Sequence, residues 1–128
     1  MALTVKSSIQ FSICNKPSDG MRGGPVCTTQ TQFNQAFSAD ILALSDGTVN
    51  LPISMQGAVK AGQIYIWSDS AISVTLVMYG SNLANTAAMQ LIPNVPSLIS
   101  AQNIVEIYVS NTTGQQAQFS IQGAGIQV

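Results

Sequence analysis

The chain has 128 residues and a formal net charge of −1, and only 7% of its residues are charged, against roughly 25% in an ordinary globular domain. This length predicts a single domain over residues 1–128 with a substantial core. The lack of positive charge excludes the electrostatic pattern of a nucleic-acid binder and of a polybasic membrane-surface protein. Neither nucleic acid nor membrane is therefore expected as a partner.

Neutral polar residues take the place of charges, since 45 of the 128 residues are Ser, Thr, Asn or Gln. A near-neutral monomer is prone to association, and a buried, unpaired charge costs several kcal/mol. The composition therefore favours a subunit of an oligomer or larger array. The alternative is an ordinary secreted β-domain that amides and hydroxyls keep in solution.

No apolar run approaches the roughly 20 residues of a membrane-spanning helix. The first residues, MALTVKSSIQ, lack the charged start and the continuous apolar stretch of a signal peptide. The sequence therefore predicts neither a membrane anchor nor export.

Alternation of apolar and polar residues starts the chain. Residues 3–13 alternate in this way and predict a long, half-buried strand. Residues 15–25 are rich in glycine and proline and predict a loop. Residues 28–37 favour a second strand with Phe33 and Phe37 on one side.

A further strand is predicted over residues 48–56. Pro52 lies within it and cannot donate a hydrogen bond to a neighbouring strand, so an edge position or a bulge is expected. The alternation places four apolar residues on the inner face: Val49, Leu51, Ile53 and Met55.

Two strands are predicted next, over residues 62–67 and 71–79, followed by one helix candidate at residues 83–90, LANTAAMQ. Within the second of these strands, one face carries Ile72, Val74, Leu76 and Met78.

The pattern as a whole predicts an all-β protein with seven to nine strands. One-sided burial and regularly spaced turns favour an antiparallel β-sandwich. A jelly roll is preferred because no blade repeat is present. An immunoglobulin-like sandwich is second, because Trp67 follows both cysteines and the Cys–Trp–Cys order is absent.

Residues 105–122 predict a closing hairpin whose register can be chosen by how it sorts the two faces. A five-residue loop, Asn111–Gln115, pairs Ser110 with Gln116. The outer face of this hairpin then carries Ile104, Glu106 and Tyr108 among glutamines and serines. Its core face carries Val105, Ile107, Val109, Ala117, Phe119 and Ile121.

Catalytic motifs are absent. Without histidine, the usual general base, the common nucleophilic triads and most zinc sites are excluded. The acids are scattered singly, and the glycines of residues 20–25 are typical of a turn rather than a phosphate loop. We therefore expect no enzyme, no metal and no cofactor; the five acids are Asp19, Asp40, Asp46, Asp69 and Glu106.

Cys14 and Cys27 flank the glycine-rich loop. A disulfide between them would constrain the unfolded chain by roughly 3 kcal/mol, but it needs an oxidising compartment, and reduced thiols are preferred. Lys16 and Arg22 lie in the same loop, where they could contact an acidic partner or be solvated.

Tyr65 and Trp67 alternate with Ile64 and Ile66 and are predicted to lie on the opposite face of their strand. There they could stack on a sugar or be covered by a loop or a neighbouring subunit, which is preferred. Asn111 opens the glycosylation sequon NTT, which without export indicates only a turn.

The texture of the chain, including its end VSNTTGQQAQFSIQGAGIQV, resembles the small all-β structural proteins of tailed bacteriophage virions, of the capsid decoration (cement) or head-fibre kind. The resemblance implies a jelly-roll or related sandwich, often trimeric, that binds the major capsid protein or another virion protein after assembly in the host cytoplasm. It supplies no catalytic residues.

A virion structural protein is therefore the leading hypothesis. Its interface candidates are Tyr65, Trp67 and Tyr108, with the loop of residues 16–25, including Lys16 and Arg22, as a contact arm. The alternative is a carbohydrate-binding or adhesin module that uses Tyr65 and Trp67. A secreted domain stapled by Cys14 and Cys27 is a third hypothesis.

Overall fold

The computed structural model describes residues 3–9, 12–13, 22–23, 27–80 and 83–127. These residues form strands and loops, and none of them forms a helix that could cross a membrane. The all-β class is therefore confirmed. The strands are β1 (Leu3–Ile9), β2 (Ser12–Ile13), β3 (Arg22–Gly23), β4 (Cys27–Phe33), β5 (Gln35–Leu44), β6 (Thr48–Pro52), β7 (Lys60–Ser68), β8 (Ser73–Gly80), β9 (Leu83–Gln90), β10 (Ser97–Asn111) and β11 (Ala117–Ile126).

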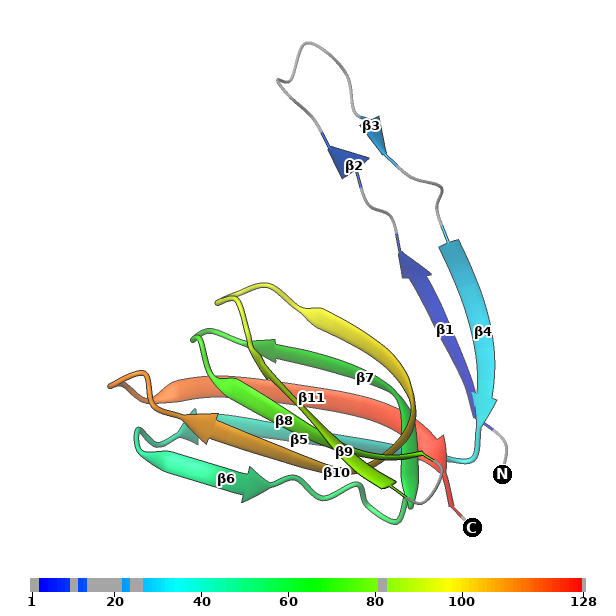
Figure 1. The fold of residues 1–128 in the computed structure, drawn as a ribbon. Helices are drawn as coiled ribbons and strands as arrows, with labels where there is room; N and C mark the ends of the chain where they lie inside the picture. Colours follow the sequence, from blue (N-terminus) through cyan, green and yellow to red (C-terminus); the bar gives the residue numbers. More distant parts are fainter. Residues whose placement is uncertain (1–2, 10–11, 14–21, 24–26, 81–82, 128) are drawn as a thin grey trace.

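Seven of these strands form one antiparallel sheet with the order β5-β11-β7-β10-β8-β9, in which β6 also pairs with β10 (Figure 1). The long strand β10 joins the two parts of this sheet. Its first part pairs with β7, and its second part pairs with β8 and β6. The register shifts between Ser100 and Ile104 and again between Ile104 and Glu106. Such bulges bend a strand, and β10 and β7 are visibly curved in Figure 1.

The core lies against the inner face of the bent sheet. Alternation along β7 buries Ile64 and Ile66 completely, and alternation along β8 buries Val74 and Leu76. Both strands contribute to one apolar cluster, so the two parts of the sheet share a core. The cluster also contains Phe37, Leu44, Ile53, Ile72, Leu91, Ile104, Ile107, Val109, Phe119 and Ile121.

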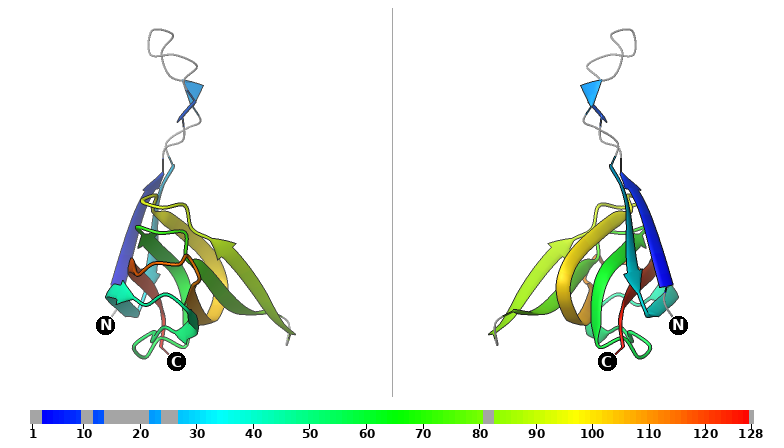
Figure 2. Two further views of the ribbon diagram at one scale, coloured as in Figure 1. Left: turned by 90° about the vertical axis from the view of Figure 1, so that its left-hand side faces the viewer. Right: turned by 90° about the vertical axis from the view of Figure 1, so that its right-hand side faces the viewer.

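A two-stranded ribbon, β1 with β4 and then β2 with β3, projects from the sheet (Figures 1 and 2). The strand predicted over residues 28–37 is broken at Asn34 into β4 and β5. At this break the Asn34 amide donates to Gly125 O at 3.1 Å, and the Gln127 amide donates to Asn34 Oδ1 at 2.6 Å. The base of the ribbon is thereby tied to the end of β11.

The strand pairing does not test the β-sandwich or the jelly-roll order that the sequence favours. The seven strands are one hydrogen-bonded sheet rather than two separate ones, so the sandwich and its jelly-roll order stay predictions. The edge position expected from Pro52 is confirmed, since β6 pairs with β10 and with no other strand of the described residues.

The helix predicted at residues 83–90 is wrong, because this segment is β9. Its alanines, leucine and methionine favour a helix intrinsically, but all eight residues pair with β8, from Gly80↔Leu83 to Ser73↔Gln90. Tertiary pairing overrides the local preference.

The predicted closing hairpin is also wrong. β10 and β11 are not neighbours, because β7 lies between them, so Ser110 does not pair with Gln116. The predicted core face is nevertheless confirmed for five of its six residues. The exception is Val105, which is half-buried, while Ile104, predicted on the outer face, is completely buried. The register shift between Ile104 and Glu106 causes this exchange. The buried residues of the predicted face are Ile107, Val109, Ala117, Phe119 and Ile121.

The predicted inner face of residues 48–56 is only partly observed. Ile53 is buried, but Val49 is 66% exposed. Asn50 has a positive φ of 50°, which breaks the strict alternation between Val49 and Leu51. By contrast, the face predicted for residues 71–79 is confirmed, with Ile72, Val74 and Leu76 buried.

Candidate interaction surface

Two aromatic side chains of β7, Tyr65 and Trp67, lie on the outer face of the sheet. The isoleucines between which they alternate are completely buried, whereas Tyr65 is 42% exposed and Trp67 is half-buried. This arrangement confirms the face predicted for both residues.

Their cross-strand neighbours are uncharged. Tyr65 pairs with Leu98 of β10 on one side and with Gln122 of β11 on the other, and Trp67 pairs with Ser120. Leu98 is itself exposed. Cross-strand partners lie on the same face about 5 Å apart, so Tyr65 and Leu98 form a continuous apolar strip bordered by an amide and a hydroxyl.

The loop between β9 and β10 lies beside the end of β7. The Asn94 amide donates to Ser68 O at 2.8 Å, which ties the loop to the end of β7. Ile92 and Val95, on either side of Asn94, are both exposed. We refer to Tyr65, Trp67, Ile92, Val95 and Leu98 together as the outer aromatic surface.

Tyr108 lies apart from this surface, at the other end of β10. Its hydroxyl donates to Glu106 Oε2 at 2.8 Å, and this hydrogen bond to a carboxylate raises the pKa of Tyr108 above its ordinary value. A hollow of about 280 Å³ lies beside the pair, between β10 and the end of β6. Tyr108 and Glu106 therefore form a second candidate interaction site, separate from the outer aromatic surface. In this site a hydrogen-bonded polar pair lies beside apolar residues.

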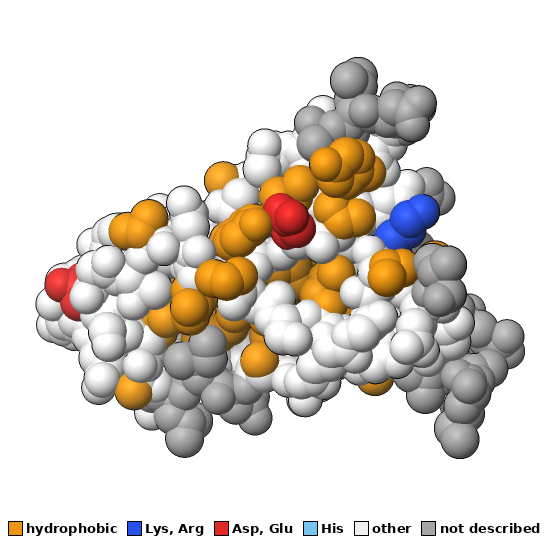
Figure 3. Space-filling view, turned by 90° about the horizontal axis from the view of Figure 1, so that it is seen from below, with side chains coloured by type: hydrophobic (Ala, Val, Ile, Leu, Met, Phe, Trp, Pro, Cys, Tyr) orange, Lys and Arg blue, Asp and Glu red, His pale blue; other side chains and the backbone are white. Residues whose placement is uncertain are grey.

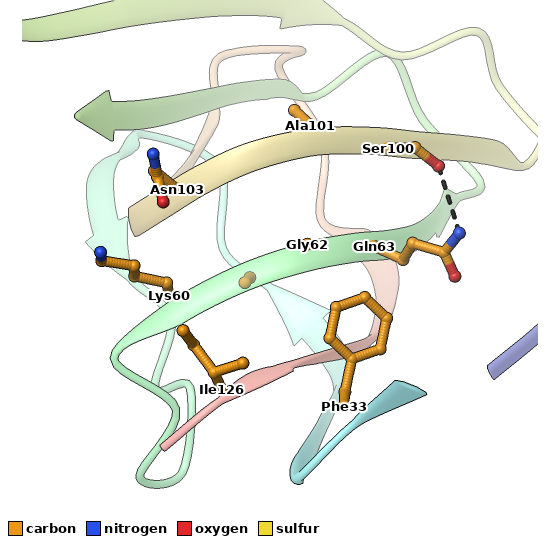
Figure 4. A pocket seen from close by; sticks show the side chains of 9 residues that line it. Phe33, Lys60, Gly62, Gln63, Ser100, Ala101, Asn103 and Ile126 are labelled. Atoms are coloured by element: carbon orange, nitrogen blue, oxygen red, sulfur yellow. Dashed lines mark hydrogen bonds between the residues drawn. The ribbon is translucent and has the colours of Figure 1, made fainter. Parts of the chain in front are cut away.

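A larger hollow of about 440 Å³ lies at the base of the ribbon. Phe33 closes one side of it, and Lys60, Asn103 and Ile126 lie around it (Figure 4). Phe33 and Lys60 come from β4 and β7, two strands that are distant in the chain. Since all these side chains come together only through sheet pairing, no local motif could have indicated this hollow.

Charged side chains in the described part of the chain are few, and two of them hold loops. Asp46 Oδ1 accepts from the Gly114 amide, and Asp69 Oδ1 accepts from the Gln118 amide, both at 2.9 Å. Asp40 lies in β5, and its side chain is outside the described ones. Figure 3 shows one face of the molecule on which isolated charged side chains stand among many hydrophobic ones.

The expected basic and cysteine residues belong to the ribbon. Arg22 of β3 pairs with Ile13 of β2, and Cys27 is the first residue of β4. Lys16 and Cys14 lie outside the described residues. The contact arm and the state of the two thiols therefore remain predictions.

Asn111, which opens the sequon, is a structural residue. Its side chain is completely buried, and its amide nitrogen donates to Leu44 O and Gln115 O, both at 2.8 Å. Its side-chain oxygen accepts from the amide and hydroxyl of Thr113. Both hydrogens of this nitrogen are therefore used in hydrogen bonds, so the folded chain cannot accept a glycan at Asn111.

The described side chains contain no group of three or more His, Cys, Asp or Glu that could hold a metal ion. The outer aromatic surface consists of exposed or half-buried aromatic and aliphatic groups with an amide and a hydroxyl beside them. Such groups bind by shape, burial and hydrogen bonding.

We compared the chain with protein-family models, curated proteins and solved structures, and found no match in any of the three comparisons.

Proposed function

We propose that this chain is a non-enzymatic structural protein of a virus particle, one that decorates or cements a capsid or forms a head-fibre or adaptor piece. The observation that carries this proposal is the outer aromatic surface, where Tyr65 and Leu98 are exposed side by side. A soluble monomer gains nothing from this exposure, whereas an interface buries such groups favourably.

The neutrality of this surface supports the same function. Interfaces are enriched in Tyr and Trp and depleted in charged residues at their centre. Because the cross-strand neighbours of Tyr65 and Trp67 are Leu98, Gln122 and Ser120, a partner could cover this surface without stranding a charge. The expected partners are the major capsid protein, or another virion protein, and further copies of this chain.

The ribbon supports a clamping role. β1 and β4 extend away from the sheet (Figure 2), and β2 and β3 form a further pair of strands. A ribbon of this kind could reach a neighbouring subunit while the sheet covers another. Binding to the assembled shell alone would stabilise it by mass action.

The β-sandwich is part of this proposal. Both parts of the bent sheet contribute to one core, which is how two packed layers bury their apolar faces. The trimer implied by the resemblance remains a prediction.

The test is to look for the chain in purified virus particles from the source material, by mass spectrometry of their proteins. We expect the chain in a fixed ratio to the major capsid protein, and we expect recombinant chain to co-sediment with shells that lack it. Replacing Leu98, an exposed residue, by Lys should weaken this co-sedimentation. Absence of the chain from the particles would contradict the proposal.

A carbohydrate-binding module is the second candidate, favoured by the placement of Tyr65 and Trp67 on one face beside Gln122. Aromatic faces with adjacent amides suit a sugar ring. Binding of the chain to a glycan array, with loss of binding in Trp67→Ala, would favour this candidate. Co-sedimentation with shells that free sugars do not reduce would favour the virion protein.

A further inference from the structure

The strand β9 forms an open edge of the main sheet. It pairs with β8 on one side, and no other described strand pairs with it. Its register with β8 runs without a shift from Gly80↔Leu83 to Ser73↔Gln90, so the edge is regular. An open edge presents a row of backbone donors and acceptors to any further strand.

The residues whose backbone faces outward can be identified. The Leu91 amide donates to Ile72 O at 2.9 Å, so the backbone of Leu91 points towards β8. Because the hydrogen-bonding direction alternates along an antiparallel strand, every second residue before Leu91 points the same way. The residues whose N–H and C=O point away from β8 are therefore Ala84, Thr86, Ala88 and Gln90.

The other described edges of the sheet carry protection that β9 lacks. On β5, Ser38 O accepts from Gln56 Nε2 at 2.7 Å, and Leu44 O accepts from Asn111 Nδ2. On β6, Pro52 has no N–H, and Asn50 has a positive φ. These are recognised ways to block pairing at an edge.

β9 itself, with the sequence LANTAAMQ, has no charge, no proline, no glycine and no bulge. A regular, neutral edge of eight residues is the kind that accepts another strand. This contrast with β5 and β6 singles out β9 as a pairing edge.

We infer that β9 pairs antiparallel with β9 of a second copy of this chain, about a twofold axis that passes beside Ala87. A second copy is the occupant because the neutral edge is complementary to itself, and its side chains bring no like charges together. A twofold contact uses the same strand on both subunits. This inference does not depend on a role in a virion.

The register follows from the outward-facing residues. In an antiparallel pair, outward-facing residues must oppose one another to exchange hydrogen bonds. Placing Ala87 on the axis opposes Thr86 to the partner's Ala88, and Ala84 to the partner's Gln90. All four outward-facing residues are then paired, whereas an axis at Thr86 or Ala88 leaves some of them unpaired.

The side chains fit this register. Ala87 would face its own counterpart as a non-hydrogen-bonded pair, in which side chains approach most closely, and alanine is small enough for that approach. On the outer face the row Val77–Thr86 would continue into Ala88 and Thr75 of the second copy. The nearest described charged side chain in this row is Glu106, which lies beyond Val77 in β10.

Cysteine cross-linking tests the register, with Cys14 and Cys27 first replaced by serine. Ala87→Cys should form a disulfide-linked dimer on mild oxidation, because directly opposed residues have Cα atoms within disulfide range. Thr86→Cys is the matched control: its counterpart lies diagonally, beyond easy reach. Cross-linking of Thr86→Cys without Ala87→Cys, or of neither, would overturn the inference.

A proline substitution tests the edge itself. The Ala88 N–H points away from β8, so Ala88→Pro should keep the subunit folded but remove a donor from the contact. We expect Ala88→Pro to halve the sedimenting mass, while Ala88→Val, which keeps the N–H, leaves it unchanged. The near-ultraviolet signal of Trp67 reports whether the subunit is folded.

The mass of the wild-type chain completes the test. A β9 contact gives even-numbered assemblies, so a dimer, a tetramer or a pair of trimers in sedimentation is expected. A monomer, an isolated trimer, or an assembly that Ala88→Pro leaves intact would overturn the inference. The last result would mean that another surface joins the subunits.

Discussion

The ring of Phe33, at the end of β4, lies directly against Gly62 of β7. A Cβ atom at Gly62 would be 2.6 Å from Phe33 Cε1, a distance that side chains do not tolerate. An aromatic ring over a glycine fills the space left by the missing side chain and fixes strand positions. This contact, together with Asn34, holds the ribbon against the sheet.

Replacing Gly62 by alanine should therefore displace the Phe33 ring. We expect a loss of about 1–3 kcal/mol in the free energy of unfolding, together with faster proteolysis of the ribbon. Gly80→Ala is the matched control, because a Cβ at Gly80 would meet nothing within 4 Å. Denaturant unfolding measures both variants, and equal stabilities would contradict the packing described here.

Asn111→Ala should destabilise the fold strongly. It would remove the hydrogen bonds of this side chain to Leu44 O, Gln115 O and the Thr113 amide. Gln115 O would keep the Thr113 hydroxyl as a donor, whereas an unpaired buried group costs about 1–3 kcal/mol. We expect a total loss of about 2–4 kcal/mol. Calorimetry can compare this variant with Thr112→Ala, an exposed neighbour that should change stability by less than about 0.5 kcal/mol.

The hydrogen bond between Tyr108 and Glu106 predicts a pH effect. Because the bond raises the pKa of Tyr108, the fold favours the neutral phenol. Its contribution to stability is complete below the ordinary tyrosine pKa of 10.0 and is lost as the pH rises through the higher folded value. Glu106→Gln should lower the pKa of Tyr108.

NMR titration with ring-labelled tyrosine measures this pKa, and Tyr108→Phe identifies the signal. A Tyr108 pKa that Glu106→Gln leaves unchanged would show that the hydrogen bond is not its cause.

The all-β class was predictable because apolar and polar residues alternate within short segments of the sequence. Ile72, Val74 and Leu76 are buried as the period of two predicts. The strand partners were less predictable, and the hairpin expected over residues 105–122 is not formed. β7 separates β10 from β11, and only long-range packing decides that order.

The candidate site was also predictable only in part. The shared face of Tyr65 and Trp67 follows from alternation alone, but their proximity to Leu98 requires the pairing of β7 with β10. The exchange of Val105 for Ile104 depends on a bulge, beside which Asn103 takes a positive φ of 62°. No sequence pattern marked that bulge.

A charge placed on the outer aromatic surface should weaken assembly without unfolding the subunit. Leu98 is exposed, so Leu98→Lys should preserve the fold while stranding a cation in any interface that covers Tyr65. Val49→Lys is the control, since Val49 is more exposed and belongs to β6. Analytical ultracentrifugation should show a weaker association for Leu98→Lys alone; equal effects would mean that general charge, rather than this surface, controls association.

The most direct test of the claim that uncharged surfaces serve assembly is the mass of the wild-type chain at micromolar concentration, measured by light scattering. We predict a stable multiple of the 13.4 kDa chain. A monodisperse monomer of 13.4 kDa would contradict it.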